Sequence, residues 1–105
     1  MLAHTEHGDY NVYLEVGHYT NNNNTALQLF TEHGSPFATI TTNIVDLPEG
    51  CAAIDINNCP WALEFLERYE LVKDYWFPVQ SGFCVYPVVQ LDLEKLKEIA
   101  KEMVA

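Results

Sequence analysis

The side chains best suited to covalent or metal chemistry in this sequence are three cysteines and four histidines. A cysteine nucleophile needs a base within hydrogen-bond reach. For Cys59 or Cys84, the candidate bases are His18 and His33. A zinc site would need several of the thiols together with a histidine. The spacing supports neither, because Cys51, Cys59 and Cys84 are odd in number and form no Cys-x-x-Cys pair. We therefore expect three buried thiols, with no disulfide, no bound metal and no cofactor.

A second group of polar residues follows the apolar segment 52–56. Asp55 lies between two isoleucines, and Asn57 and Asn58 come directly after it. We expect Asp55 to accept hydrogen bonds from the backbone amides of the turn at 57–59, which would fix a strand-to-helix corner. Metal binding by these three residues is the alternative, but the segment lacks the alternating acidic ligands of a calcium loop. The sequence also contains no Gly-rich phosphate loop and no catalytic-serine elbow, so no residue is assigned a catalytic role.

The corner leads into a short amphipathic helix. Pro60 suits the first helical position, and apolar side chains then recur with helical spacing over residues 61–69. This pattern predicts that Trp61 and Phe65 are buried against a sheet. The residues to which we assign a structural role at the corner are Asp55, Asn57, Asn58, Pro60, Trp61 and Phe65.

Charge is distributed unevenly along the chain. The formal net charge is −10, and residues 1–67 contain nine carboxylates but neither Lys nor Arg. We expect this region to present a negative surface to a basic protein partner, although acidity can also serve solubility alone. Direct binding of nucleic acid is disfavoured because phosphate contacts need Lys and Arg. The acids expected to gather on one exposed, partner-binding face are Glu15, Glu32, Asp46 and Glu49.

The elements needed to position these groups fit one domain of 105 residues, in which residues 1–8 are expected to be flexible. No apolar segment reaches the roughly 20 residues of a membrane span and no signal peptide is apparent, which predicts a cytoplasmic protein. Alternating or β-branched segments predict strands at 10–19, 25–31, 37–44, 52–56 and 83–91. Helices are predicted at 61–69 and, after the N-cap Asp92, at 93–104. The order β-β-β-β-α-β-α predicts an α+β fold, with an antiparallel sheet of about five strands and both helices on one face.

Two details of this plan bear on binding. Residues 71–80 have no clear period and are predicted to form a loop, in which the aromatic residues Tyr75 and Trp76 are partly exposed and available to a partner. Pro87 interrupts the last strand, which predicts an edge position or a bulge there.

Two motifs resemble those of a known family. Residues 54–61 read Ile-Asp-Ile-Asn-Asn-Cys-Pro-Trp, and residues 81–87 read Ser-Gly-Phe-Cys-Val-Tyr-Pro. Together with the segments 27–29 and 36–41, they resemble the bacterial family known as domain of unknown function 4313. The resemblance covers residues 10–91, and the helix after Asp92 is expected to extend beyond the family pattern. It implies a small protein of bacterial mobile elements, among accessory genes some of which counter host defence, and it transfers no catalytic residue.

Charge and resemblance together lead to one functional expectation and two alternatives. We expect a non-enzymatic inhibitor, of the anti-CRISPR or antirestriction type, that binds a basic surface of a host defence protein. The first alternative is a general protein-interaction module or homodimer joined through a sheet edge or the aromatic residues near position 75. The second, less favoured, is a small Cys/His enzyme or metal protein.

Overall fold

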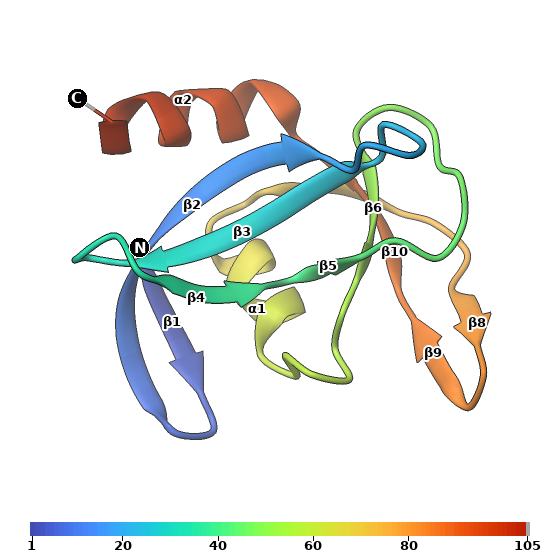
Figure 1. Cartoon of the computed structure of the whole chain (residues 1–105), viewed down its shortest axis with the longest axis horizontal. Coiled ribbons are helices and arrows are strands. Elements are labelled where there is room, and N and C mark those ends of the chain that lie inside the picture. Colours follow the sequence, from blue (N-terminus) through green and yellow to red (C-terminus); the bar gives the residue numbers. More distant parts are fainter. Residues whose placement is uncertain (105) are drawn as a thin grey trace.

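The structure is a computed structural model that describes the backbone of residues 1–104 and the side chains of residues 1–99. Two four-stranded antiparallel sheets, a separate hairpin and two helices make up these residues (Figure 1). The first sheet contains, in spatial order, β1 (Leu2–Thr5), β2 (Gly8–His18), β3 (Thr25–Thr31) and β4 (Pro36–Thr39). The second contains β5 (Thr41–Thr42), β6 (Cys51–Ile54), β10 (Val88–Leu91) and β7 (Val72–Tyr75). The remaining elements are the hairpin β8 (Val79–Ser81) and β9 (Cys84–Tyr86), and the helices α1 (Ala62–Arg68) and α2 (Leu93–Val104).

The predicted α+β class is confirmed, but the predicted single sheet is divided in two at Ile40. The Ile40 amide donates to the carbonyl oxygen of Leu27 in the first sheet, at 3.0 Å. The Ile40 carbonyl oxygen accepts from the amide of Asp55, which directly follows β6 of the second sheet, at 2.9 Å. The strand predicted at 37–44 therefore breaks into β4 and β5, and its fully buried Ile40 passes from one sheet to the other.

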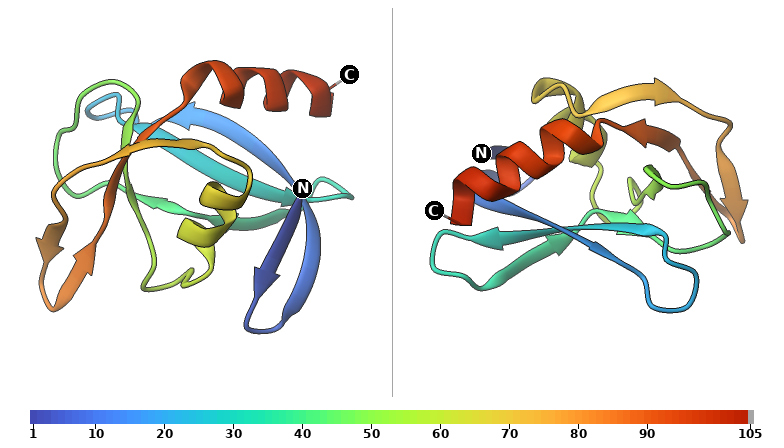
Figure 2. Two further views of the ribbon diagram at one scale, coloured as in Figure 1. Left: turned by 180° about the vertical axis from the view of Figure 1, so that it is seen from behind. Right: turned by 90° about the horizontal axis from the view of Figure 1, so that it is seen from above.

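Both sheets and both helices share one hydrophobic core. In β2 and β3 the expected alternation places Val12, Leu14, Leu27 and Leu29 inside. They join Phe65 and Leu66 of α1, Leu96 of α2 and apolar residues of β6 and β10 in the same cluster. Helix α1 packs near β1, whereas α2 runs along β2 (Figure 2). Among the described residues, neither helix is long and apolar enough to cross a bilayer.

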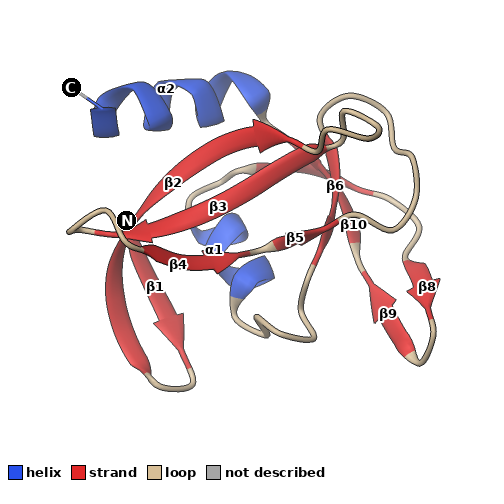
Figure 3. Ribbon diagram, viewed as in Figure 1, coloured by secondary structure: helices blue, strands red, loops and turns tan. Residues whose placement is uncertain are grey.

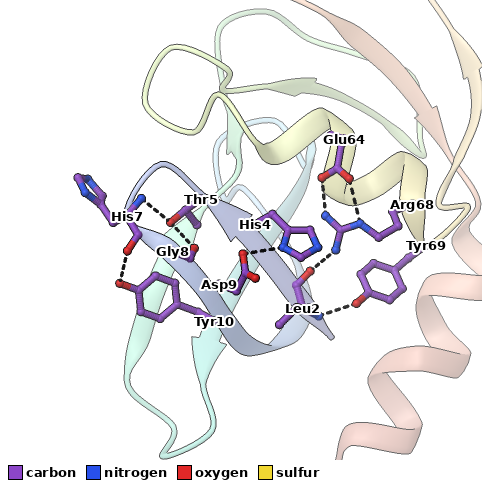
Figure 4. A network of polar contacts seen from close by, with 10 residues as sticks. All are labelled: Leu2, His4, Thr5, His7, Gly8, Asp9, Tyr10, Glu64, Arg68 and Tyr69. Carbon is purple, nitrogen blue, oxygen red and sulfur yellow. Dashed lines mark hydrogen bonds and ion pairs between the residues drawn. The ribbon is translucent and has the colours of Figure 1, made fainter.

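The N-terminal segment, for which no strand was predicted, forms β1 and pairs with β2 from Leu2 opposite Asn11 to Thr5 opposite Gly8. Helix α1 holds this strand from the side. The Leu2 amide donates to the Tyr69 hydroxyl at 2.5 Å, and the Arg68 guanidinium donates to the Leu2 carbonyl oxygen at 2.5 Å (Figure 4). The sequence showed no alternating apolar pattern for this strand, because Ala3 is its only fully buried side chain.

The region before α2 also differs from the prediction. Part of the segment predicted as a loop at 71–80 forms β7 and most of β8, and the strand predicted at 83–91 is split by Pro87 into β9 and β10. Strand β10 lies between β6 and β7, so the edge position, one of the two outcomes predicted from Pro87, is wrong for it, and its register shift lies between Gln90 and Leu91 rather than at the proline. The ladder tolerates the proline because Pro87 lies between strands and contributes only its carbonyl oxygen, which accepts from the Ile54 amide at 2.9 Å.

Candidate functional site

The strand-to-helix corner is closed by Asp55. Its Oδ1 atom accepts from the backbone amide of Asn58 at 3.2 Å, and its Oδ2 atom accepts from the Asn58 side-chain amide at 2.9 Å. Asn57 and Pro60 are exposed beside it. Because both Asp55 oxygens bind Asn58 within the turn, these two residues brace the corner locally, while the structural role of Asn57 and Pro60 stays a prediction. Among the described side chains, no three His, Cys, Asp or Glu residues converge as metal ligands would.

Two aromatic residues, Trp61 and Phe65, pack the corner against the hydrophobic core. Phe65 is completely buried, whereas Trp61 is only half-buried and stands just before the first residue of α1. Their rings meet edge to face, with centroids 6.2 Å apart. Trp61 therefore packs against the core on one side and remains accessible on the other.

All three cysteines are free thiols; Cys51 and Cys59 are buried and Cys84 is half-buried. Burial raises the pKa of Cys51, and burial followed by the negative charges of Asp55 and Glu6 raises the pKa of Cys59. A raised pKa keeps a thiol protonated, whereas a nucleophile or metal ligand must be a thiolate. The environments of Cys51 and Cys59 thus disfavour the thiolate form that nucleophilic attack and metal binding require.

The four acids predicted to share a face come from strand β2, from the β3–β4 loop and from the loop between β5 and β6. Asp46 accepts a hydrogen bond from Asn22 Nδ2 at 2.9 Å and therefore lies beside the β2–β3 loop. Glu32 follows the opposite end of β3, which has seven residues and thus spans about 23 Å. Glu15 projects from the middle of β2, and Glu49 lies in the loop before β6. Glu32 and Asp46 therefore lie far apart, so the four acids do not form one compact patch, and their sharing of one exposed face stays a prediction.

A buried asparagine network joins the β2–β3 loop to the loop that follows β5. Asn24 is 5% exposed, and its Nδ2 atom donates to Asn43 Oδ1 at 2.9 Å and to the Val45 carbonyl oxygen at 2.7 Å. Its Oδ1 atom accepts from the Leu47 amide at 3.0 Å. The sequence has four consecutive asparagines here, at positions 21–24. Their number was the available indication that side-chain amides replace backbone pairing there.

The most unusual surface is formed by exposed apolar side chains between β7 and β9. Phe77 is 91% exposed and Phe83 is completely exposed, while Tyr75, Trp76 and Val85 are each about half exposed. We call these five residues the aromatic arm. Tyr75 and Trp76 were predicted from the sequence, but Phe83 and Val85 were missed because both were assigned to one long strand at 83–91, of which Phe83 was the first residue. The Ser81-Gly82 turn directly before Phe83 was the sequence indication that a hairpin tip lies there.

The β8–β9 part of the aromatic arm packs on the rest of the domain through the face opposite its exposed residues. In the β8–β9 hairpin, which projects away from both sheets (Figure 3), Val79 pairs with Tyr86. These two side chains pack on a small cluster formed by Cys51, Ala53 and Val88. The hairpin is thus anchored through one face, which leaves Val85 and the tip residue Phe83 without an intramolecular cover.

Hydrogen bonds also fix the start of the arm. The Trp76 amide donates to the Val88 carbonyl oxygen at 2.8 Å. The Tyr75 hydroxyl donates to Glu67 Oε2 at 2.5 Å, a bond that raises the pKa of Tyr75 together with burial and the carboxylate charge. The exposed rings are therefore presented from an ordered backbone, which lowers the entropy that a binding partner would have to overcome.

Comparison with known families gives one match. The model of a family described as Domain of unknown function (DUF4313) matches residues 13–105, which confirms the resemblance inferred from the two motifs. The match continues past Asp92 to residue 105, so the expectation that the C-terminal helix lies outside the family pattern is wrong. Comparisons with curated proteins and with solved structures give no significant match.

Proposed function

We propose that this chain, which belongs to the DUF4313 family, is a non-enzymatic domain that binds a basic protein partner through the aromatic arm. The observation that carries this proposal is the exposure of Phe77 and Phe83 on an anchored segment. Large aromatic side chains are enriched at the energetic centres of protein interfaces. Exposed apolar side chains grouped on one part of an otherwise polar domain are typical of such a site.

Charge favours a basic partner over a second copy of the chain. Each copy carries a formal charge of −10, so two copies repel one another at long range. Around the arm, Asp74 and the Tyr75-bound Glu67 are exposed acids. A partner with Lys and Arg around an apolar patch would satisfy both features of this surface.

The class of partner that we propose is a host defence protein of the CRISPR or restriction type, whose nucleic-acid-binding surface is basic. This choice is supported by the net charge and by the mobile-element setting implied by the family resemblance. Because the acids are dispersed, the aromatic arm rather than one acidic face would supply the specific contacts. The negative field would then attract the partner without defining where it docks.

Plasmid and phage interference by several CRISPR and restriction systems, measured with and without this protein, tests the proposal. We expect at least one system to be inhibited. The double substitution Phe77→Ser and Phe83→Ser should abolish inhibition without unfolding the protein, because both side chains are almost fully exposed. The matched control is Tyr13→Ser, since Tyr13 is 44% exposed on β2, outside the arm.

Two results would count against the proposal. If no system is inhibited, the defence partner is wrong. If the double variant inhibits as well as the wild type, the arm is not the docking surface, whatever the partner.

A further inference from the structure

A concave surface lies at the tip of the β1–β2 hairpin. The tip of the β1–β2 hairpin, strand β4 and the corner before α1 line an open cavity of about 330 Å³. This is within the size range of small-ligand sites. The β1–β2 hairpin and the β8–β9 hairpin lie at different ends of the molecule (Figure 1), and no residue of the aromatic arm lines the cavity.

Three aromatic rings line this cavity. Tyr10 and Phe37 have ring centroids 5.2 Å apart and inclined at 51°, and Phe37 and Trp61 have centroids 6.0 Å apart at 61°. The row continues into the core, because Trp61 meets the fully buried Phe65. The wall of the cavity is therefore supported from behind, and its rings are inclined to one another rather than stacked in parallel.

The hairpin tip is ordered by its own hydrogen bonds. The Tyr10 hydroxyl donates to the His7 carbonyl oxygen at 3.3 Å, and the His7 amide donates to Thr5 Oγ1 at 3.1 Å (Figure 4). Thr5 Oγ1 in turn donates to the Gly8 carbonyl oxygen at 2.9 Å. These bonds hold Tyr10 over the tip and place Glu6, between Thr5 and His7, at the rim of the cavity.

The charge of the cavity is negative. Glu6 is its only lining carboxylate, and none of its lining residues is Lys or Arg. The Glu6 carboxylate lies 3.7 Å from His7 Nε2. Burial and then the negative charges of Asp55 and Glu6 raise the pKa of Cys59, another lining residue.

We propose that this cavity binds an organic cation, an alkylammonium or guanidinium group, against the rings of Tyr10, Phe37 and Trp61 with Glu6 as the counter-charge. Aromatic faces attract such cations through their quadrupoles, even at exposed sites. The proposal is independent of the aromatic arm and goes beyond the proposed docking function. The cation could be a free amine or a Lys or Arg side chain of a bound protein.

Other ligand classes fit less well. An anion would find no lining Lys or Arg to neutralise it. Glu6, His7 and Cys59 all line the cavity, but no three metal-ligating side chains converge within the described part of the chain. A neutral apolar ligand would not pair with the Glu6 carboxylate. It would also displace part of the water that hydrates this carboxylate, which costs free energy.

The test follows the Trp61 indole signal by NMR in the full-length protein during titration with choline. The matched probe is 3,3-dimethylbutan-1-ol, which has the same shape without the charge. We expect a saturable shift with choline and none with the neutral alcohol. Glu6→Gln and Tyr10→Leu should each weaken choline binding by about two- to fivefold, the factor expected for one exposed ion pair or cation–π contact. Tyr13→Leu, on the outer side of β2, should leave binding unchanged.

Two further arms distinguish the source of the cation. Capped tripeptides containing lysine, trimethyllysine or arginine are titrated beside choline. Tighter binding of a peptide identifies a side chain of a partner as the ligand, and tighter binding of choline identifies a free amine. Equal shifts with the neutral alcohol, or unchanged choline binding by both Glu6→Gln and Tyr10→Leu in variants whose remaining spectra match the wild type, would overturn the proposal.

Discussion

Replacing Asn24 with alanine is expected to destabilise the domain more than its position in a loop would suggest. The substitution removes three hydrogen bonds from a side chain that is only 5% exposed. It also leaves the Leu47 amide and the Val45 carbonyl oxygen without these partners. At roughly 1 kcal/mol for each bond, the free energy of unfolding should fall by about 3 kcal/mol. For a domain of this size that corresponds to a loss on the order of 10–20 °C in Tm.

Urea unfolding of wild type and variant measures this loss as a lower midpoint at an unchanged m-value. Asn24→Asp is the isosteric probe. It retains an acceptor for Leu47 but sets a carboxylate against two acceptor oxygens, so we expect it to be at least as damaging. Asn21→Ala is the matched control, because Asn21 is exposed and accepts only a hydrogen bond from Asn43 Nδ2, at 2.8 Å. A cost below about 0.5 kcal/mol for Asn24→Ala, or an equal cost for the control, would refute the bracing role.

Three further predictions follow from burial and ionisation. Phe65→Ala should lower the free energy of unfolding by about 3–5 kcal/mol, and Trp61→Ala by less, because Phe65 is fully buried and Trp61 is half-buried; urea unfolding compares them. The Cys59 thiol, whose pKa is raised by burial, should be alkylated by iodoacetamide much more slowly in the native than in the urea-unfolded protein, and equal rates would contradict its burial. The hydrogen bond from Arg68 lowers the pKa of Glu64, so this pair stabilises the fold above the unfolded-state pKa of about 4.3, and the contribution is lost as the pH falls through the lowered value. Glu64→Gln should flatten the dependence of stability on pH in that acidic range, and an unchanged profile would show that the pair contributes nothing.

Local patterns predicted those elements whose partners are close in the sequence. The alternation in residues 25–31 coincides with β3, and Asp92 accepts the Lys95 amide at 3.1 Å as an N-cap should. In each case the side chains that determine the structure lie within a few positions of one another.

The elements that were missed depend on distant partners. Strand β1 contributes one fully buried side chain and is held by Arg68 and Tyr69, which follow more than 60 positions later. The break at Ile40 requires partners in two sheets, Leu27 and Asp55, which no local period encodes. The positions of the acids in space also depend on distant contacts. The sequence shows that residues 1–67 lack cations, but not that Glu32 and Asp46 lie at opposite ends of β3.

This dispersal of charge changes how the acidity can work in binding. A compact acidic patch would provide both attraction and docking position, but scattered carboxylates provide only a long-range field, which salt screens. Such a field acts mainly on the rate of association, whereas desolvated aromatic contacts act mainly on the rate of dissociation. The two parts of the proposed interaction are therefore physically separable. Salt should slow association of the wild type and of a Phe83 variant alike, while loss of the Phe83 ring should accelerate dissociation at every salt concentration.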